Sequence, residues 1–233
     1  MRALLLAQNL SEVLTEAMNP ESVNIGGIEI TTSLISAVIV TVFLLVMCLI
    51  VRFVCLPRFK DVPKGFQALL EWVVDFFDGI AKENSPLARK SVSPYIVTCG
   101  VFIFFGTMIE MLGLRPVFAD INSCLALALC TFFLINYFGV RKNGPVGRIT
   151  SYFRTSGIAA PFRMLSDLIT PVSLTLRLYG SILSGFLIME MIYAVVAIIV
   201  PIPLSLVFTV FHAVIQAYIF SLLSSLFIGE AME

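Results

Sequence analysis

One arginine lies in the middle of a long apolar run. Between Leu168 and Val200, Arg177 is the only Lys or Arg. Its charge is permanent, and placing such a charge at the centre of a bilayer helix costs roughly 2.5–3.5 kcal/mol. Gly180 and Ser181 follow one turn later, and small residues let another helix approach closely. We therefore expect Arg177 to attract a carboxylate on another subunit. The alternative is that Arg177 pairs with a carboxylate or with backbone carbonyls in a purely structural contact between helices.

A carboxylate and the only histidine of the chain are placed symmetrically about a proline. Glu190 lies 11 residues before Pro201, and His212 lies 11 residues after it. In an antiparallel hairpin this spacing predicts similar depth, where carboxylate and imidazole could exchange a proton. A hydrogen-bonded pair that fixes the hairpin register is the alternative. Gln216 shares the face of His212, and taken alone a glutamine there most often makes an interhelical hydrogen bond.

Three further polar residues mark the boundary between two apolar segments. Glu110 ends one segment, and Asp120 and Asn122 begin the next. They could line an aqueous entrance on the outer side of a membrane. For each residue separately, an ordinary solvated helix terminus is the favoured interpretation.

The composition indicates the elements that must position these residues. With 59% hydrophobic and 13% charged residues, the chain cannot cover itself with a soluble surface, so it is an integral membrane protein. Helices of about 20 apolar residues span a bilayer. We predict an all-α fold in a single membrane domain (1–233), with five membrane helices at 31–56, 94–114, 121–140, 158–200 and 204–228.

Two other segments connect these helices. Residues 60–84 carry polar residues at spacings of three and four, opposite an apolar face, which predicts an amphipathic helix lying in the membrane plane. Residues 141–157 contain Asn143-Gly144-Pro145 and are expected to form a cytoplasmic loop.

The last two membrane helices are expected to form a long tilted hairpin. The 33 residues from Leu168 to Val200 would extend about 50 Å as a helix, against roughly 30 Å of hydrocarbon. The surplus predicts a steep tilt. Assigning loops alternately places twelve of the 15 Lys and Arg residues on one side, which predicts an outside N-terminus and a cytoplasmic C-terminus.

Several function classes find no support in the sequence. With one histidine and no Cys-x-x-Cys, a metal site is not expected, and the five cysteines suit packing. No phosphate loop or hydrolase motif is present, so we expect no cofactor and no catalysis. The balance of 15 basic and 15 acidic residues gives no indication of nucleic acid binding.

Three motifs resemble a known family. They are Pro171-Val-Ser-Leu-Thr-Leu-Arg-Leu-Tyr-Gly-Ser181, Gln216-Ala-Tyr-Ile-Phe220 and Ala119-Asp-Ile-Asn122. Together they are similar to subunit a of the rotary F-type ATP synthases, prokaryotic type, and the resemblance covers nearly the whole chain. The family has five spans, a surface helix and an outside N-terminus.

The resemblance implies a mechanism. Subunit a is the membrane stator, which faces a ring of c subunits with buried carboxylates, while subunit b forms the peripheral stalk and the other F1Fo subunits complete the complex. Two half-channels lead ions, H⁺ or alternatively Na⁺, to the carboxylates. Arg177 would attract the passing carboxylate and separate the half-channels, with Gln216 beside it. A bacterial plasma membrane location follows.

The sequence departs from the family at several positions. Ser181 stands where Asn is usual, Phe186 where many members have Glu or His, and Thr209 at the usual partner position. Glu190 and His212 are both displaced outward, so relay roles are assigned to them by compensation. A secondary transporter for a small cation, with Arg177 as substrate ligand or counter-ion, is the rival function, and a purely structural membrane subunit is the third.

Overall fold

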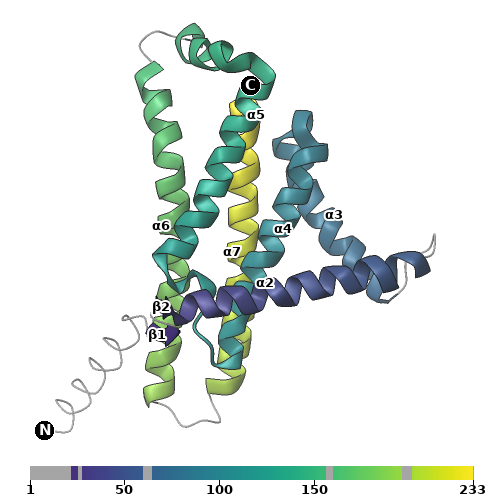
Figure 1. Cartoon of the computed structure of the whole chain (residues 1–233), viewed down its shortest axis with the longest axis vertical. Coiled ribbons are helices and arrows are strands. Elements are labelled where there is room, and N and C mark those ends of the chain that lie inside the picture. Colours follow the sequence, from purple (N-terminus) through teal and green to yellow (C-terminus); the bar gives the residue numbers. More distant parts are fainter. Residues whose placement is uncertain (1–21, 26–27, 60–64, 156–159, 196–200, 233) are drawn as a thin grey trace, which may run out of the picture.

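The computed structural model describes residues 22–25, 28–59, 65–155, 160–195 and 201–232. The long helices are α2 (Thr32–Ile50), α3 (Phe66–Asn84), α4 (Arg89–Met108), α5 (Ile121–Thr155), α6 (Ala160–Val195) and α7 (Pro201–Met232). Short π and 3₁₀ turns extend α2 to Arg58, precede α4 at Pro86–Ala88, follow it at Ile109–Leu112 and precede α5 at Val117–Ala119. Figure 1 shows α5, α6 and α7 running along the length of the molecule.

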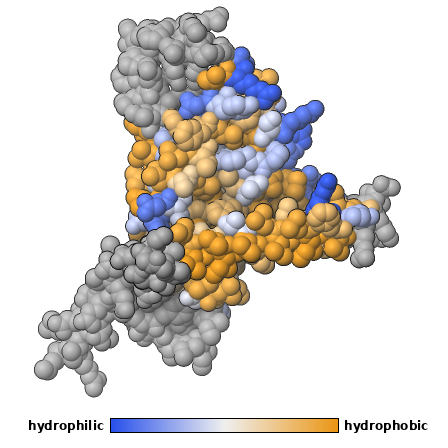
Figure 2. Space-filling model, in the orientation of Figure 1, coloured by the Kyte–Doolittle hydropathy of each residue, from blue (hydrophilic) through white to orange (hydrophobic). Residues whose placement is uncertain are grey.

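The all-α prediction with five membrane helices is confirmed. In the described residues, five helical segments are long and apolar enough to cross a bilayer: Thr32–Cys55, Pro86–Leu112, Ile121–Lys142, Ile169–Met189 and Leu206–Met232. Apolar side chains cover α2 along its length, as an element facing lipid requires (Figure 2).

The amphipathic segment forms α3, which begins at Phe66. Its apolar face buries Phe77, Ile80 and Ala81, and the helix packs against α4 and α7. On its polar side Gln67 Nε2 donates to Glu71 Oε1 at 2.8 Å. Val73 is partly buried against the core, whereas Phe66, Leu69, Trp72 and Phe76 are exposed, so α3 joins the bundle along a single stripe.

A short β-hairpin precedes the first membrane helix and was not expected. Strand β1 (Ser22–Ile25) pairs antiparallel with β2 (Ile28–Thr31), and Ser22 lies opposite Thr31. Alternating β-branched residues on both sides of Gly26-Gly27 are a hairpin signal. The first predicted element begins at residue 31 and so covers only the apolar run after this hairpin.

The expected loop at 141–157 is wrong in its secondary structure, because α5 continues to Thr155. Figure 1 shows the last part of this helix turning across the top of the molecule towards α6. Apolar residues at 146, 149 and 153 keep a helical spacing beyond Pro145. Glycine and proline therefore coincide with a change of direction here instead of ending the helix. The cytoplasmic location of this segment stays a prediction.

The last two helices pack against each other as an antiparallel hairpin of 36 and 32 residues. In Figure 1, α2 crosses the direction of α6 and α7 at a steep angle. Spanning helices in general lie within about 40° of the membrane normal, so α2 and the hairpin cannot all be upright. The tilt of α6 and α7 in the membrane stays a prediction.

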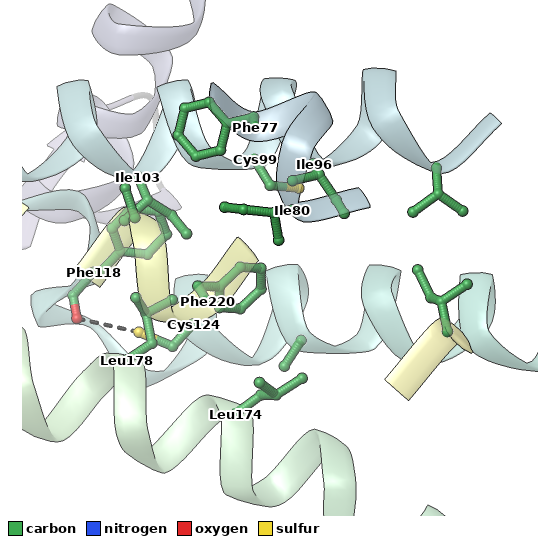
Figure 3. Close-up of a cluster of buried hydrophobic side chains, with 14 of the residues drawn as sticks. Phe77, Ile80, Ile96, Cys99, Ile103, Phe118, Cys124, Leu174, Leu178 and Phe220 are labelled. Carbon is green, nitrogen blue, oxygen red and sulfur yellow. Dashed lines mark hydrogen bonds between the residues drawn. The ribbon is translucent and has the colours of Figure 1, made fainter. Parts of the chain in front are cut away.

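The core lies where α3, α4, α5, α6 and α7 meet. Figure 3 shows Phe77, Ile103, Phe118, Leu178 and Phe220 converging from five elements. Buried Cys124 donates through Sγ to the Phe118 carbonyl at 3.2 Å. Its thiol acts as a small apolar group with a weak donor. This core holds α6 and α7 in register, and so fixes the polar residues between them.

Candidate functional site

A hydrogen bond between α6 and α7 forms the centre of the site. Ser181 Oγ lies 2.9 Å from Gln216 Oε1, and it is also within reach of the Arg177 and Leu178 carbonyls at 2.8 and 3.2 Å. Gln216 is 4% exposed. Its Nε2 is buried and has no partner among the described residues. The amide therefore uses its acceptor within the chain and keeps its donors available.

Arg177 lies one helical turn before Ser181 and is exposed on the surface of the chain. Within the described ranges its guanidinium makes no ion pair or hydrogen bond. Exposed Leu176 precedes Arg177 in the chain, and exposed Ile188 lies three turns after it on the same face of α6. A permanent charge in such a face calls for a partner that this surface does not supply.

His212 lies one turn before Gln216 on α7, as the i, i+4 spacing predicted. Its ring stacks on Phe208, with centroids 6.0 Å apart and planes 19° apart. A Cβ atom added to Gly185 would lie 3.7 Å from His212 Cε1 and Nε2, an ordinary contact distance, so the imidazole packs close to Gly185. Nε2 is buried and has no hydrogen-bond partner in the described part of the chain.

These contacts define the register of the hairpin. Ser181 lies opposite Gln216, and Gly185 lies opposite His212 and Phe208. Continuing this register places the backbone of Glu190 roughly one helical turn nearer to Pro201 than that of His212. The predicted similar depth of the two residues therefore holds only to within about one turn. The count about Pro201 is offset because α7 begins at Pro201 itself, whereas α6 ends at Val195. The side chain of Glu190 lies outside the described part of the structure.

Comparison with known proteins identifies the family. The profile described as the ATP synthase A chain matches residues 32–229, which include every spanning helix and the polar cluster. The chain belongs to this family. As a prokaryotic F-type subunit a, it is a stator subunit of the Fo sector that takes part in ion translocation, assembles with other ATP synthase subunits and has no catalytic activity of its own.

Known relatives are similar to this protein in sequence over most of the chain. It is similar to ATP synthase subunit a 2 of Bradyrhizobium sp. (strain BTAi1 / ATCC BAA-1182), with 33% identity over 213 residues, which cover 90% of this chain and 92% of the relative. ATP synthase subunit a of Moorella thermoacetica (strain ATCC 39073 / JCM 9320) is 27% identical, with coverage of 93% and 98%. These matches do not favour the secondary transporter, and they support a multi-pass bacterial membrane protein.

The structure adds one residue of this subunit a that sequence reasoning passed over. The guanidinium carbon of Arg115 lies 5.7 Å from the centroid of the Phe186 ring, within cation–π range. Phe186 occupies the position where many family members place Glu or His. A signal was available, because Arg115 is the only Lys or Arg between the second and third predicted membrane helices.

Two of the three residues predicted at the entrance, Asp120 and Asn122, lie at the start of α5. Asp120 accepts from the Asn122 backbone N–H at 3.0 Å and from Thr31 Oγ1 at 3.4 Å. This is the helix-terminus role favoured for it from the sequence. Glu110 lies in the 3₁₀ turn Ile109–Leu112, and Asn122 is exposed. Their entrance role stays a prediction. Among the described residues, no group of three His, Cys, Asp or Glu side chains could hold a metal ion.

Proposed function

We propose that this subunit a conducts ions, with H⁺ the first candidate and Na⁺ the alternative, through two half-channels to and from the carboxylates of a c-subunit ring. Arg177 would face the ring, attract each deprotonated carboxylate as it passes and separate the half-channels. The observation that carries this proposal is the exposed Arg177, which makes no ion pair within the described residues and lies on the face of α6 that also exposes Ile188. A ring of lipid-embedded helices would cover that face and bring the missing anion.

Gln216 would assist the arginine. Its unused Nε2 donors are suited to a carboxylate, which accepts hydrogen bonds only. Ser181, through its bond to Oε1, would hold the amide in place. A carboxylate arriving between Arg177 and Gln216 would thus meet the positive charge of Arg177 from α6 and the N–H donors of Gln216 from α7.

Glu190 and His212 would form the relay of the outer half-channel. The unused Nε2 of His212 is an available proton site. Because the register offsets the two backbones by roughly a turn, exchange with Glu190 would run through a bridging water. Glu110, Asp120 and Asn122 would line the entrance to this pathway.

The positive-inside bias supports an outside N-terminus and a cytoplasmic C-terminus in a bacterial plasma membrane. The peripheral stalk of subunit b would hold the chain against rotation. Each unit charge crossing the membrane would supply about 2.3 kcal/mol per 100 mV.

The decisive experiment is ATP-driven acidification of inverted membrane vesicles that carry Arg177→Ala. We expect pumping to fall to background while immunoblots show the chain and the assembled complex at wild-type levels. Arg52→Ala is the matched control, because Arg52 is an exposed arginine in the π-helical turn after α2. Wild-type pumping with Arg177→Ala would overturn the proposal.

A further inference from the structure

A cavity of about 400 Å³ lies at the end of the bundle away from the α6–α7 connection. Its lining includes Leu87 and Ser91 beside the start of α4, Phe138, Arg141 and Lys142 of α5, and Met232 of α7. Hydrophilic residues gather at this end in Figure 2, which is the end that carries the C-terminus and the α3–α4 junction in Figure 1. The ion pathway proposed above uses none of these residues.

The cavity lies at one boundary of the membrane. One spanning segment starts at Pro86, just before the lining residue Leu87, and the lining cations Arg141 and Lys142 directly follow the apolar stretch 121–140 of α5. Residues at the ends of spanning helices lie at the level of lipid headgroups. The lining is therefore placed where a headgroup would be, with hydrocarbon on one side of it.

Two cations of the cavity have capacity to bind an anion. Lys142 Nζ donates to the Met232 backbone carbonyl, which joins α5 to the end of α7 and leaves two of its three N–H donors. Neither Arg141 nor Lys142 pairs with a carboxylate in the described residues. In contrast, nearby Arg89 is already bound to Asp78.

The rest of the lining suits an amphipathic ligand. Ser91 adds a hydroxyl group in the first turn of α4, where the helix dipole is positive. Phe138 and Met232 are buried apolar walls, and Leu87 is 72% exposed at the mouth. A free phosphate would use only the two cations and the serine, whereas a phospholipid would also cover Leu87.

We propose that this cavity binds the phosphodiester headgroup of an anionic phospholipid, and that its acyl chains leave past Leu87. Arg141 offers a fork of donors to the phosphate, and Lys142 supplies a second charge. Basic pockets between spanning helices have the chemistry that recognises anionic headgroups. The bound lipid would join α4, α5 and α7 at the boundary.

Lipid retention by the intact ATP synthase complex tests the proposal. The complex is equilibrated in detergent with equal amounts of phosphatidylglycerol and phosphatidylcholine, washed, and its retained lipid quantified by mass spectrometry. The wild type should enrich phosphatidylglycerol, and Arg141→Gln with Lys142→Gln should reduce that enrichment by roughly thirtyfold, the combined contribution of two cations at a lipid surface. Arg52→Gln with Lys82→Gln removes the same charge from exposed positions outside the cavity lining and should retain the lipid. Equal losses in both double variants would overturn a specific site.

A second measurement avoids the risk that the variants fail to assemble. A photoreactive phosphatidylglycerol added to the wild-type complex should label residues 87–91 and 138–142, and a matching phosphatidylcholine probe should not. Labelling spread evenly over α2 would overturn the proposal. Complete displacement of the lipid probe by inorganic phosphate would identify a free-anion site instead. Protection by another subunit, with no lipid retained, would assign the cavity to a protein contact and also overturn it.

Discussion

Polar groups are used differently in two parts of α7. In the middle of the helix, two buried nitrogens, His212 Nε2 and Gln216 Nε2, have no partner among the described residues, and Arg177 of α6 is exposed one turn before Ser181. Nearer the C-terminal end of α7, Ser85 and Ser225 share a hydrogen bond of 3.2 Å. Ser85 Oγ also reaches the Ala81 carbonyl at 3.1 Å, and Ser225 Oγ reaches the Ile80 carbonyl at 3.3 Å.

The Ser85–Ser225 contact is completed within the chain, although Ser221 Oγ and Ser224 Oγ of the same helix are buried without a partner among the described residues. A buried polar group without a partner costs about 1–3 kcal/mol. The region of Arg177 differs because it combines unpaired buried nitrogens with an exposed permanent charge. Under the proposed function, the rotor would cover this region and supply the missing partner. The predictions below test this division.

The largest effect is expected from a substitution of Arg177 that keeps its positive charge. Arg177→Lys keeps a cation, yet we expect ATP-driven pumping in inverted vesicles to fall to background. Lysine offers a point charge that can lose its proton in an apolar site, while arginine offers a planar fork that cannot. Immunoblots of the assembled complex provide the control. Pumping at half the wild-type rate or more would mean that charge alone suffices.

The proposed relay should show a smaller loss. Glu190→Gln and His212→Ala are each expected to slow ion flow by at least about a hundredfold, the lower range for a positioned proton-transfer group. The swapped double variant, Glu190→His with His212→Glu, should recover part of the flow because it restores both groups. Passive proton conduction through Fo stripped of its F1 head is the measurement. Unchanged conduction in both single variants would remove the two residues from the pathway.

Much of this division could be read from the sequence because membrane constraints are strong. Apolar length placed the five spans, and the cost of a charge in lipid singled out Arg177. The family motifs brought Ser181 and Gln216 into one site, and the structure joins these two by a hydrogen bond. Where a single free-energy term dominates, such as the cost of a charge in lipid, the sequence pattern is sufficient to predict the feature.

Other features depended on packing that the sequence does not encode locally. The register that offsets Glu190 from His212 comes from side-chain contacts between α6 and α7, not from a count about Pro201. Arg115 meets Phe186 only through the fold of the turn before α5. The loop predicted at 141–157 from Pro145 is wrong because proline can kink a helix as well as end it.

A change at the contact between α3 and α7 should alter the thermal stability of the protein. A Cβ atom at Gly229 would lie 2.0 Å from the Asn84 backbone oxygen, so Gly229→Ala must push α7 away from α3. Overpacking of this kind costs roughly 1–3 kcal/mol. Thermal unfolding, followed by a thiol-reactive dye that reports exposure of buried Cys99 and Cys124, should shift to lower temperature.

Gly79→Ala is the matched control for that shift. Gly79 lies inside α3, and an added Cβ would meet nothing within 4 Å. Alanine in a helix interior is favoured over glycine by up to about 1 kcal/mol, so this variant should melt at the wild-type temperature or slightly higher. Equal melting temperatures for the two alanine variants would mean that the close approach of α7 to Asn84 carries no stability.

The smallest effect concerns a completed contact that faces water. Arg89 donates from Nε to both Asp78 oxygens at 3.0 and 3.1 Å, and this hydrogen bonding lowers the pKa of Asp78 below its ordinary value of 3.8, with Ser93 as a second donor. A lowered folded-state pKa stabilises the fold above the unfolded pKa, and that contribution is lost as pH falls through the folded value. The melting temperature of the complex should therefore fall slightly more between pH 5 and pH 3, as approximate limits around the carboxyl range, in the wild type than in Asp78→Asn. Arg89→Gln keeps the carboxyl but removes its main donor, so it should lose the same acid step. An unchanged step in both variants would show that this exposed pair, unlike the buried serines beside α7, does not hold the junction together.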